Sequence, residues 1–379
     1  MKYKLTVSAA SGVESVTKRE LFKLGYGDCP AINGRIQLYG DEADILRLNV
    51  NLRTAERVMI VVKECTAETF DELFDAVISV QWKDYIARDG KIMVSGKSVK
   101  SKLFAISACQ GIVKKAIAEN LMKAYGDNFL SESGNAYGVE FALFEDKLTI
   151  SINTSGEGLH KRGYRDLSVR APLKETLAAA TVMLSNWSFD KPLVDLFCGS
   201  GTIPIEAALY ALNIAPNKER SFDCQKWGII SQQLSDRVYQ EALDNEIKGK
   251  KFEICGYDID DSVIGISLRH SRRAGVLDTL HFAKADMKCF YSTISGGTLI
   301  SNLPYGERLL SEDEVRKLYG EFGDVYRRLD RWSLYAFTSC KTFEYDFGQY
   351  ADKRRKLYNA DLECCLYQYG KDQRNIRIK

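Results

Sequence analysis

The amino-terminal half of the chain alternates short apolar runs with stretches of helical periodicity, which is typical of small α/β units. The apolar runs predict strands, the last two forming a hairpin, at Tyr3–Ala9, Arg35–Tyr39, Arg57–Val62, Ile92–Val99, Val139–Phe144 and Leu148–Ile152. The helical stretches are Gly12–Leu24, a segment from Glu42, Phe70–Val80 and Leu103–Tyr125. We therefore expect small α/β domains in this half.

The carboxyl-terminal half repeats a strand, a turn and a helix, which favours a mostly parallel, doubly wound sheet. Its predicted strands are Leu193–Phe197, Phe252–Tyr257, Leu280–Ala285, Leu299–Asn302 and Ser333–Thr338. At the tail, Lys356–Tyr358 and Leu362–Tyr369 flank the turn residues Asn359-Ala360-Asp361. This tail predicts a hairpin that adds an antiparallel edge strand.

A connector rich in glycine and charge, Gly158–Arg165, separates the two halves and suits an exposed joint between domains. Pro172 follows at a position that suits the first turn of a helix. Apolar and small residues then recur at helical spacing, at Leu173, Leu177, Ala178, Thr181 and Leu184. We expect this helix to open the second domain.

Length and composition narrow the class of protein. A chain of 379 residues with 45 % hydrophobic content exceeds the size at which single cores stop growing, so more than one domain is expected. The ten cysteines are scattered without paired metal spacing and the three histidines lie far apart, so we expect reduced thiols and no metal. The sequence shows no signal-peptide core after Met1 and no apolar run of membrane-spanning length, so a cytoplasmic protein without a membrane partner is predicted.

A glycine-rich turn after the first strand of the second half carries the cofactor candidates. They are Asp195, Phe197, Cys198, Gly199, Ser200, Gly201 and Thr202, ahead of a predicted helix at Ile203–Leu212. Glycines let the backbone approach a ligand, and the helix start offers unpaired N–H groups. Similar turns bind dinucleotides or are purely structural, so the motif alone leaves the ligand open.

Acidic residues after the next two strands sharpen this prediction. Asp258, followed by Ile259, stands where a carboxylate accepts hydrogen bonds from ribose hydroxyls, and Asp286, followed by Met287, stands near the adenine edge. Strand-end capping is the alternative role for both acids. The separation of Asp195 and Asp258 far exceeds the roughly 20 residues of a minimal dinucleotide unit, so an insertion over residues 213–249 is expected.

The fourth strand of the second half ends in Asn302-Leu303-Pro304-Tyr305, which resembles the Asn-Pro-Pro-Tyr signature of amino-group methyltransferases. A base amine delocalises its lone pair into the ring and needs acceptors that hold its hydrogens. The Asn302 side-chain oxygen and the Leu303 carbonyl can each accept one, while Tyr305 stacks on the extruded base. Leu303 replaces a proline of the signature, but the carbonyl it must supply is kept, and Pro304 still favours extended geometry before it.

Three segments together resemble the THUMP-containing guanine-N2 RNA methyltransferases, in their form with a single methyltransferase domain. The segments are Gly158–Arg165, Ala171–Ala180 and Asn302–Leu309. The resemblance implies a ferredoxin-like domain over residues 1–65, a THUMP RNA-binding domain over 66–160 and a Rossmann-like class I methyltransferase domain over 161–379. The implied strand order is 3-2-1-4-5-7-6, with the antiparallel edge strand already predicted.

The same resemblance implies S-adenosylmethionine as cofactor, S-adenosylhomocysteine as product, and guanosine N2 in 23S rRNA or a precursor ribosomal particle as substrate. Glu175 and Asn302 would also border the cofactor. RNA phosphates would be contacted by the lysines of a basic stretch, Lys97, Lys100, Lys102, Lys114 and Lys115, and by Lys161, Arg162 and Arg165 of the connector. A solvated helix face, or capping and interdomain salt bridges, are the alternatives for these cations.

Other functions stay open at this point. Transfer RNA is the main rival substrate, and adenine-N6 methylation would use the same four residues at 302–305. A non-catalytic RNA-binding assembly factor and, least favoured, a dehydrogenase are the remaining alternatives.

Overall fold

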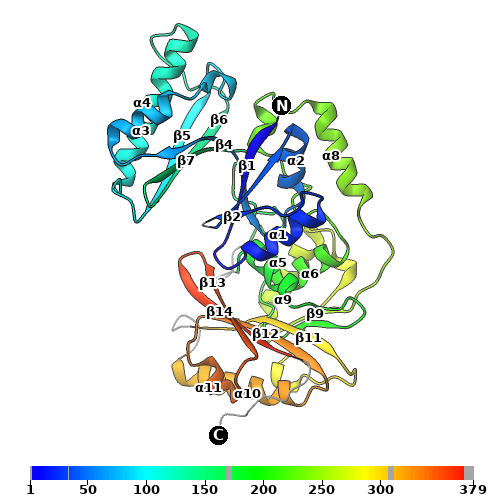
Figure 1. Cartoon of the computed structure of the whole chain (residues 1–379). Helices are drawn as coiled ribbons and strands as arrows, with labels where there is room; N and C mark the ends of the chain where they lie inside the picture. Colours follow the sequence, from blue (N-terminus) through cyan, green and yellow to red (C-terminus); the bar gives the residue numbers. More distant parts are fainter. Residues whose placement is uncertain (1, 33, 168–172, 306–310, 371–379) are drawn as a thin grey trace.

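The structure is a computed structural model that describes residues 2–32, 34–167, 173–305 and 311–370. Within these ranges the chain forms two seven-stranded sheets, one in each half (Figure 1). Pro172 and Ala171, and the part of the methyltransferase-like segment that follows Tyr305 up to Leu309, lie outside the described residues. No helix in the described ranges is both long and apolar enough to span a membrane.

The amino-terminal sheet has the order β2-β3-β1-β4-β7-β6-β5. Its strands are β1 (Tyr3–Ala9), β2 (Ala31–Ile32), β3 (Arg35–Gly40), β4 (Ala55–Thr66), β5 (Lys91–Val99), β6 (Ala136–Phe144) and β7 (Lys147–Asn153). Strand β4 pairs with β1 through its first half and with β7 through its second half. It is longer than the predicted Arg57–Val62, because polar residues such as Lys63 and Glu64 continue a strand that is only partly buried. One sheet therefore runs through the predicted boundary at residue 65.

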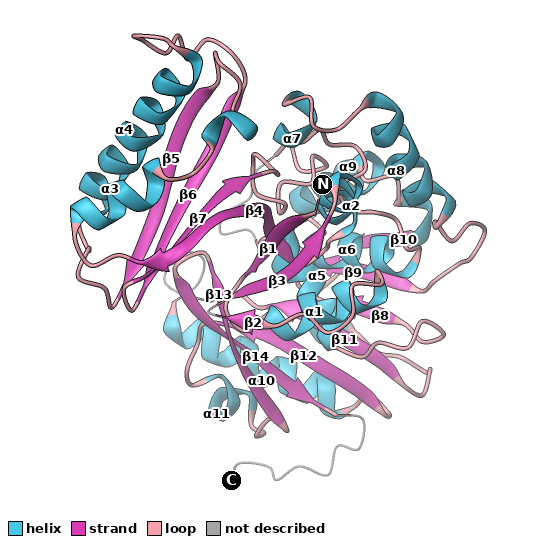
Figure 2. Cartoon of the chain, turned by 45° about the horizontal axis from the view of Figure 1, so that its top comes forward, coloured by secondary structure: helices cyan, strands magenta, loops and turns pink. Residues whose placement is uncertain are grey.

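Helices cover one face of each part of this sheet (Figure 2). They are α1 (Glu14–Lys23), α2 (Glu42–Asn51), α3 (Phe70–Ile78) and α4 (Ile106–Tyr125), with a short 3-10 turn at Trp82–Asp84. Helices α2 and α3 begin at capping boxes, in which the side chains of Asp41 and Thr69 accept from the third helical residue. Helix α4 packs on β5 and β6 through residues such as Val113 and Phe141.

The carboxyl-terminal sheet has the order β10-β9-β8-β11-β12-β14-β13, which confirms the predicted order 3-2-1-4-5-7-6. Its strands are β8 (Leu193–Asp195), β9 (Ile254–Asp258), β10 (Leu280–Lys284), β11 (Gly297–Asn302), β12 (Trp332–Thr338), β13 (Lys353–Asn359) and β14 (Leu362–Tyr369). The first five are parallel, and β14 is antiparallel to β12 and β13, as predicted. The carboxyl ends of β8, β9, β10 and β11 consequently meet at one edge.

The helices of this half flank the sheet on both faces. They are α5 (Glu175–Leu184), α6 (Thr202–Ala211), α7 (Asp223–Lys226), α8 (Gln232–Asp244), α9 (Asp261–Arg273), α10 (Glu312–Arg327) and α11 (Phe343–Phe347), with 3-10 turns at Leu277–Thr279 and Met287–Cys289. Helix α5 begins two residues after Leu173, which was expected inside it, because Lys174 has extended backbone geometry. Glu175 thus stands at the helix start, as predicted.

The connector is not the exposed joint that its glycines and charges suggested. Leu159, Arg162 and Tyr164 are buried, and the Arg162 Nε lies 3.5 Å from Glu206 Oε1 of α6. Arg162 also donates to the carbonyls of Leu159 (Nη1, 2.6 Å) and Arg53. The buried charge is tolerated because each of the three guanidinium nitrogens has a hydrogen-bond acceptor. The connector therefore ties the two halves together.

The insertion over residues 213–249, which separates Asp195 from Asp258, also has a structural role. Its helix α8 packs against α2, and Arg47 pairs with Glu241 at 2.9 Å between Nη2 and Oε2. Nearer the connector, the Cys224 amide donates to the carbonyl of Thr154 at 3.1 Å. The insertion thus attaches the methyltransferase-like half to both parts of the amino-terminal half.

Candidate active site

The turn after β8 has the backbone geometry that the glycine pattern predicted. Gly199 and Gly201 have φ angles of +50° and +80°, in the left-handed region that favours glycine. A Cβ on Gly201 would lie 3.0 Å from the ring of Phe282 and 3.1 Å from Ser267 Cβ. Any side chain at residue 201 would therefore be both strained and crowded.

Helix α9 holds this turn from behind. The Ser267 hydroxyl donates to the Gly199 carbonyl at 2.7 Å, and the Nδ1 atom of buried His270 lies 3.2 Å from the Ser200 carbonyl. On the other side, the Cys198 amide donates to the Tyr257 carbonyl of β9 at 2.9 Å. The turn that leads into Thr202 and α6 is thereby fixed while its helix start stays open for a ligand.

Asp258 and Asp286 stand at neighbouring strand ends, as predicted. Asp258 accepts from the Gly199 amide through Oδ2 at 2.9 Å, and Asp286 accepts from the Lys288 amide at 3.0 Å. Both acids thus do cap backbone, yet a carboxylate oxygen that accepts one hydrogen bond can accept a second. Beside them Met287 is buried, and Ile259 is 66 % exposed. An exposed apolar side chain directly after Asp258 suits an adenosine, whose base has apolar faces and whose ribose hydroxyls donate hydrogen bonds.

Asp195 lies beneath the turn and connects it to β11. Its Oδ1 accepts from the Phe197 amide at 3.0 Å and from the Ser301 hydroxyl at 2.8 Å, while the Ser301 oxygen accepts from the Leu196 amide at 3.2 Å. Burial raises the pKa of Asp195 to about 7, and the nearby Asp258 carboxylate adds to this increase. The folded protein therefore resists ionising this group.

Asp195→Asn is expected to stabilise the ligand-free protein in a pH-dependent way. In the unfolded chain Asp195 ionises near pH 4, whereas in the folded chain it ionises near pH 7, so wild-type stability falls as the pH rises between these values. Asparagine keeps the Oδ1 acceptor without the charge. The variant should gain up to about 4 kcal/mol over wild type at pH 8 and little at pH 4, measured by urea unfolding.

The control for this prediction is Asp260→Asn. Hydrogen bonds from Ser262 lower the pKa of Asp260, so removing its charge should give no gain at pH 8. Equal stability of wild type and Asp195→Asn across the pH range would contradict the prediction.

Glu175 is buried at the start of α5 and pairs with Arg165, whose Nη1 lies 3.2 Å from Oε1. The same Nη1 atom donates to the Leu173 carbonyl at 2.9 Å. Arg165 is therefore engaged in holding a residue expected to border the cofactor. For Arg165 these contacts favour the capping alternative, within one half of the chain, and for buried Arg162, which reaches the Arg53 carbonyl, they favour the interdomain alternative. Contact of either residue with RNA stays a prediction.

Asn302 ends β11, and its Oδ1 is a buried acceptor to which no described residue donates a hydrogen bond. The next residue, Leu303, is fully buried, and its amide donates to the Phe337 carbonyl of β12 at 2.9 Å. Among the described residues, no donor is bonded to the Leu303 carbonyl either. Two acceptors in succession thus lack partners where the sequence predicted that an amine is held.

Tyr305, which was expected to stack on a base, contacts the β13–β14 hairpin. Its hydroxyl faces the side chains of Asn359 and Cys364 in the β13–β14 hairpin, and burial raises its pKa. The ring is held by this hairpin beside the end of β11. Stacking of a base on the Tyr305 ring stays a prediction.

The five lysines of the basic stretch do not gather on one surface. Lys97 on β5 lines a cavity of about 320 Å³ together with Arg57 and Glu140, on the sheet face opposite α4. Lys114 and Lys115 lie on α4 and pair with Glu132 and Glu119. Lys102, which follows β5 and Lys100, pairs with Glu68. Acids therefore offset much of this charge, with Glu119 inside the stretch and Glu68 and Glu132 outside it.

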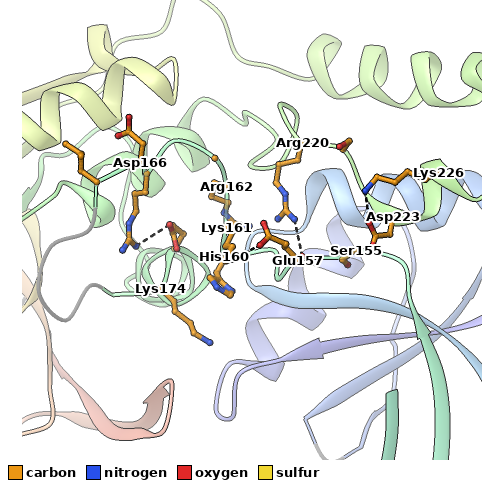
Figure 3. A pocket seen from close by; sticks show the side chains of 15 residues that line it. Ser155, Glu157, His160, Lys161, Arg162, Asp166, Lys174, Arg220, Asp223 and Lys226 are labelled. Atoms are coloured by element: carbon orange, nitrogen blue, oxygen red, sulfur yellow. Dashed lines mark hydrogen bonds and ion pairs between the residues drawn. The ribbon is translucent and has the colours of Figure 1, made fainter. Parts of the chain in front are cut away.

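A cavity of about 920 Å³ lies where the connector, the start of α5 and the insertion meet (Figure 3). Six lysine and arginine side chains and four carboxylates line it. Sequence analysis had named Lys161 and Glu175 among its residues but missed Lys174, Arg220 and Lys226. The charge of the insertion was the available signal, and it was set aside because the segment was treated as spacing.

The comparisons with known proteins bear on this architecture. A family model described as the RMKL-like methyltransferase domain matches residues 162–368. The chain belongs to the RMKL-like methyltransferase family. Models of the RlmL ferredoxin-like domain and of the THUMP domain match residues 4–59 and 67–153 of this RMKL-like methyltransferase. The predicted family and fold class are thus confirmed.

Two curated relatives are similar over nearly the whole RMKL-like chain. "Putative RNA methyltransferase YpsC" of Bacillus subtilis is 41 % identical over 100 % of this chain and 98 % of its own length. "Ribosomal RNA large subunit methyltransferase K/L" of Syntrophotalea carbinolica is 31 % identical over 97 % of this chain. The chain spans only 53 % of that second relative.

Among solved structures, the "putative methyltransferase" SMU.472, in complex with S-adenosylhomocysteine (SAH), is 40 % identical with a TM-score of 0.90. The match covers 100 % of this chain and 99 % of the other. Together with the family match, this confirms the predicted cofactor, S-adenosylmethionine.

Proposed function

We propose that this RMKL-like methyltransferase transfers a methyl group to the exocyclic N2 of a guanosine in 23S rRNA. The observation that carries the proposal is the buried Asn302 Oδ1, which no described residue bonds, followed directly by the Leu303 carbonyl. An amine with two hydrogens matches two adjacent acceptors. The guanine assignment rests on the resemblance of the connector and of the segment from Asn302.

The cofactor would be held by the residues around the turn after β8. Gly199 and Gly201 let the backbone approach the cofactor closely, the start of α6 offers backbone N–H groups, and Asp258 offers carboxylate oxygens to ribose hydroxyls. Asp286, Ile259 and Met287 would border the adenine. When bound, S-adenosylmethionine supplies an electrophilic methyl group and leaves as S-adenosylhomocysteine.

The chain's own residues would then hold the nucleophile. Asn302 and the Leu303 carbonyl draw the two amine hydrogens away from the plane of the base, which returns the nitrogen lone pair to the reaction. Reaching these acceptors requires a base that is extruded from its stack or already unpaired. A single-stranded or looped guanosine is therefore the expected target.

RNA as the substrate is supported by the THUMP match and by the names of both curated relatives. The large cavity beside Glu175 adds a physical reason, because its lining carries more cations than anions and its exposed lysines can contact phosphates. Lys161 and Lys226 are more than half exposed there. We propose that the RNA passes this cavity on its way to Asn302.

The decisive experiment uses the full-length chain, S-adenosylmethionine and RNA from a strain that lacks the gene. Ribosomal and transfer RNA are incubated separately, digested and analysed by mass spectrometry. N2-methylguanosine should appear in 23S rRNA. Its appearance in transfer RNA alone would move the substrate to transfer RNA, and N6-methyladenosine would overturn the guanine assignment. No methylation of either RNA would favour the non-catalytic assembly factor.

A further inference from the structure

Two hydrogen bonds fix the main chain on either side of the Leu303 carbonyl. Before it, the Leu303 amide donates to the Phe337 carbonyl at 2.9 Å. After it, the Pro304 carbonyl accepts from the hydroxyl of Tyr319 on α10 at 2.7 Å. The first bond depends on the departure from the Asn-Pro-Pro-Tyr signature, because a proline at residue 303 has no N–H to donate.

The second bond belongs to a chain of hydrogen bonds whose direction is determined. The Cys340 amide donates to the Thr338 Oγ1 at 3.1 Å, and Thr338 Oγ1 lies 3.0 Å from the Tyr319 hydroxyl. Since the only proton of Tyr319 goes to the Pro304 carbonyl, the Thr338 hydroxyl must donate to the Tyr319 oxygen. Each donor in this series of hydrogen bonds makes one bond.

The surroundings keep this arrangement rigid. The side chains of Tyr319 and Thr338 are inaccessible to solvent, and the Tyr319 ring packs edge-on against Phe343 at 5.0 Å between centroids. Water cannot compete for the Tyr319 hydroxyl at such a depth. Burial also raises the pKa of Tyr319, so the hydroxyl remains a donor at neutral pH.

We propose that Tyr319 is a positioning residue for methyl transfer, which acts by fixing the peptide between Leu303 and Pro304. With both ends of this short segment bonded, the Leu303 carbonyl between them keeps one orientation without accepting a bond from any described residue. Thr338 orients the Tyr319 hydroxyl. The inference rests on the proposed function, in which that carbonyl accepts a hydrogen of the amine.

Helix α10 offers a matched control. Tyr326, two turns further along the helix, is equally buried, and its hydroxyl oxygen lies 3.2 and 3.1 Å from the carbonyl oxygens of Trp332 and Gly370. Tyr326→Phe removes a buried phenol from the same helix without touching residues 302–305. Both phenylalanine variants should lose a similar amount of stability, seen as a similar shift of the urea unfolding midpoint.

Tyr319→Phe should lower kcat for RNA methylation about 10- to 100-fold, the scale expected when an active-site group is displaced by a fraction of an ångström to one ångström. KM for RNA and the dissociation constant of S-adenosylhomocysteine should stay within about twofold. Tyr326→Phe should keep near-wild-type kcat. Equal kcat in the two variants would overturn the assignment, as would a loss in Tyr319→Phe explained by weaker cofactor or RNA binding.

A second measurement does not depend on the RNA substrate. Hydrogen exchange of the Leu303 amide should be faster in Tyr319→Phe than in Tyr326→Phe, because only the former frees the segment that follows it. If the wild-type chain methylates no RNA, the proposed function fails while exchange still decides the role of Tyr319. Identical Leu303 exchange in both variants would mean that Tyr319 does not hold the segment.

Discussion

Asn302→Ala is expected to slow methyl transfer by at least about 100-fold, the effect of removing one preorganised hydrogen-bonding group from an active site. The lost atom is the buried Oδ1 at the end of β11, which no described residue uses. Its absence leaves one amine hydrogen without an acceptor and returns the lone pair to the ring. The measurement is single-turnover methylation of RNA, so that product release does not mask the step.

Two controls separate this role from a general defect. Asn302→Asp keeps an acceptor oxygen at the same position and should retain more activity than the alanine variant. Affinity for S-adenosylhomocysteine, measured by calorimetry, should fall far less than the transfer rate in Asn302→Ala, although Asn302 is also expected to border the cofactor. A rate within about threefold of wild type would remove Asn302 from the chemistry.

Arg162→Met is expected to cost about 3–5 kcal/mol of stability, the range found when one partner of a buried ion pair is removed. The side chains of Arg162 and Glu206 are 1 % and 0 % exposed. Without Arg162, Glu206 keeps only the Tyr164 hydroxyl, at 3.1 Å, as a direct donor among the described residues. Urea unfolding of the full chain measures the loss.

The mechanism of this loss can be checked in two ways. Burial already raises the pKa of Glu206, and in the variant its protonation at low pH should relieve part of the cost, so the deficit should shrink from pH 8 to pH 5. Adding Glu206→Gln should likewise recover stability. Arg269→Ala is the surface control: that side chain is 55 % exposed and pairs with Asp166, so the loss of stability should be far smaller than in Arg162→Met. A comparable loss in both arginine variants would contradict the buried-pair explanation.

The sequence predicted the parallel strands because buried strands leave long apolar runs, and it placed Asn302 at a strand end for the same reason. It did not predict the bond between Arg162 and Glu206, because a charged residue in a glycine-rich stretch looks solvated until the fold brings an acid from α6 beside it. Leu303 shows a similar limit. The hydrogen bond from the Leu303 amide to the Phe337 carbonyl depends on the register of β11 and β12, which the local sequence pattern does not specify.

The basic stretch shows another limit, because the sequence did not predict how its lysines are arranged, while their contact with RNA stays a prediction. The lysines were counted along the chain, but Lys97 faces away from the helix that carries Lys114 and Lys115. The two-residue alternation of β5 contained this information, since Ile92 and Val94 mark the face turned toward α4. The pairing of Lys102 with Glu68 and of Lys114 with Glu132 could not be predicted from the sequence, because the fold alone brings these residues together.

The apolar clusters do not respect the limits of the three family matches. Val16 of α1 and Val13, just before that helix, belong to the same buried cluster as Leu177 and Leu357, and Leu46 of α2 shares a cluster with Val238 of the insertion. A fragment that starts at residue 162 would therefore expose a hydrophobic surface that α1 and α2 cover in the whole chain, and it should aggregate when it is produced alone. Replacing the THUMP domain by that of another enzyme should succeed only if α1 and α2 are kept together with the methyltransferase half.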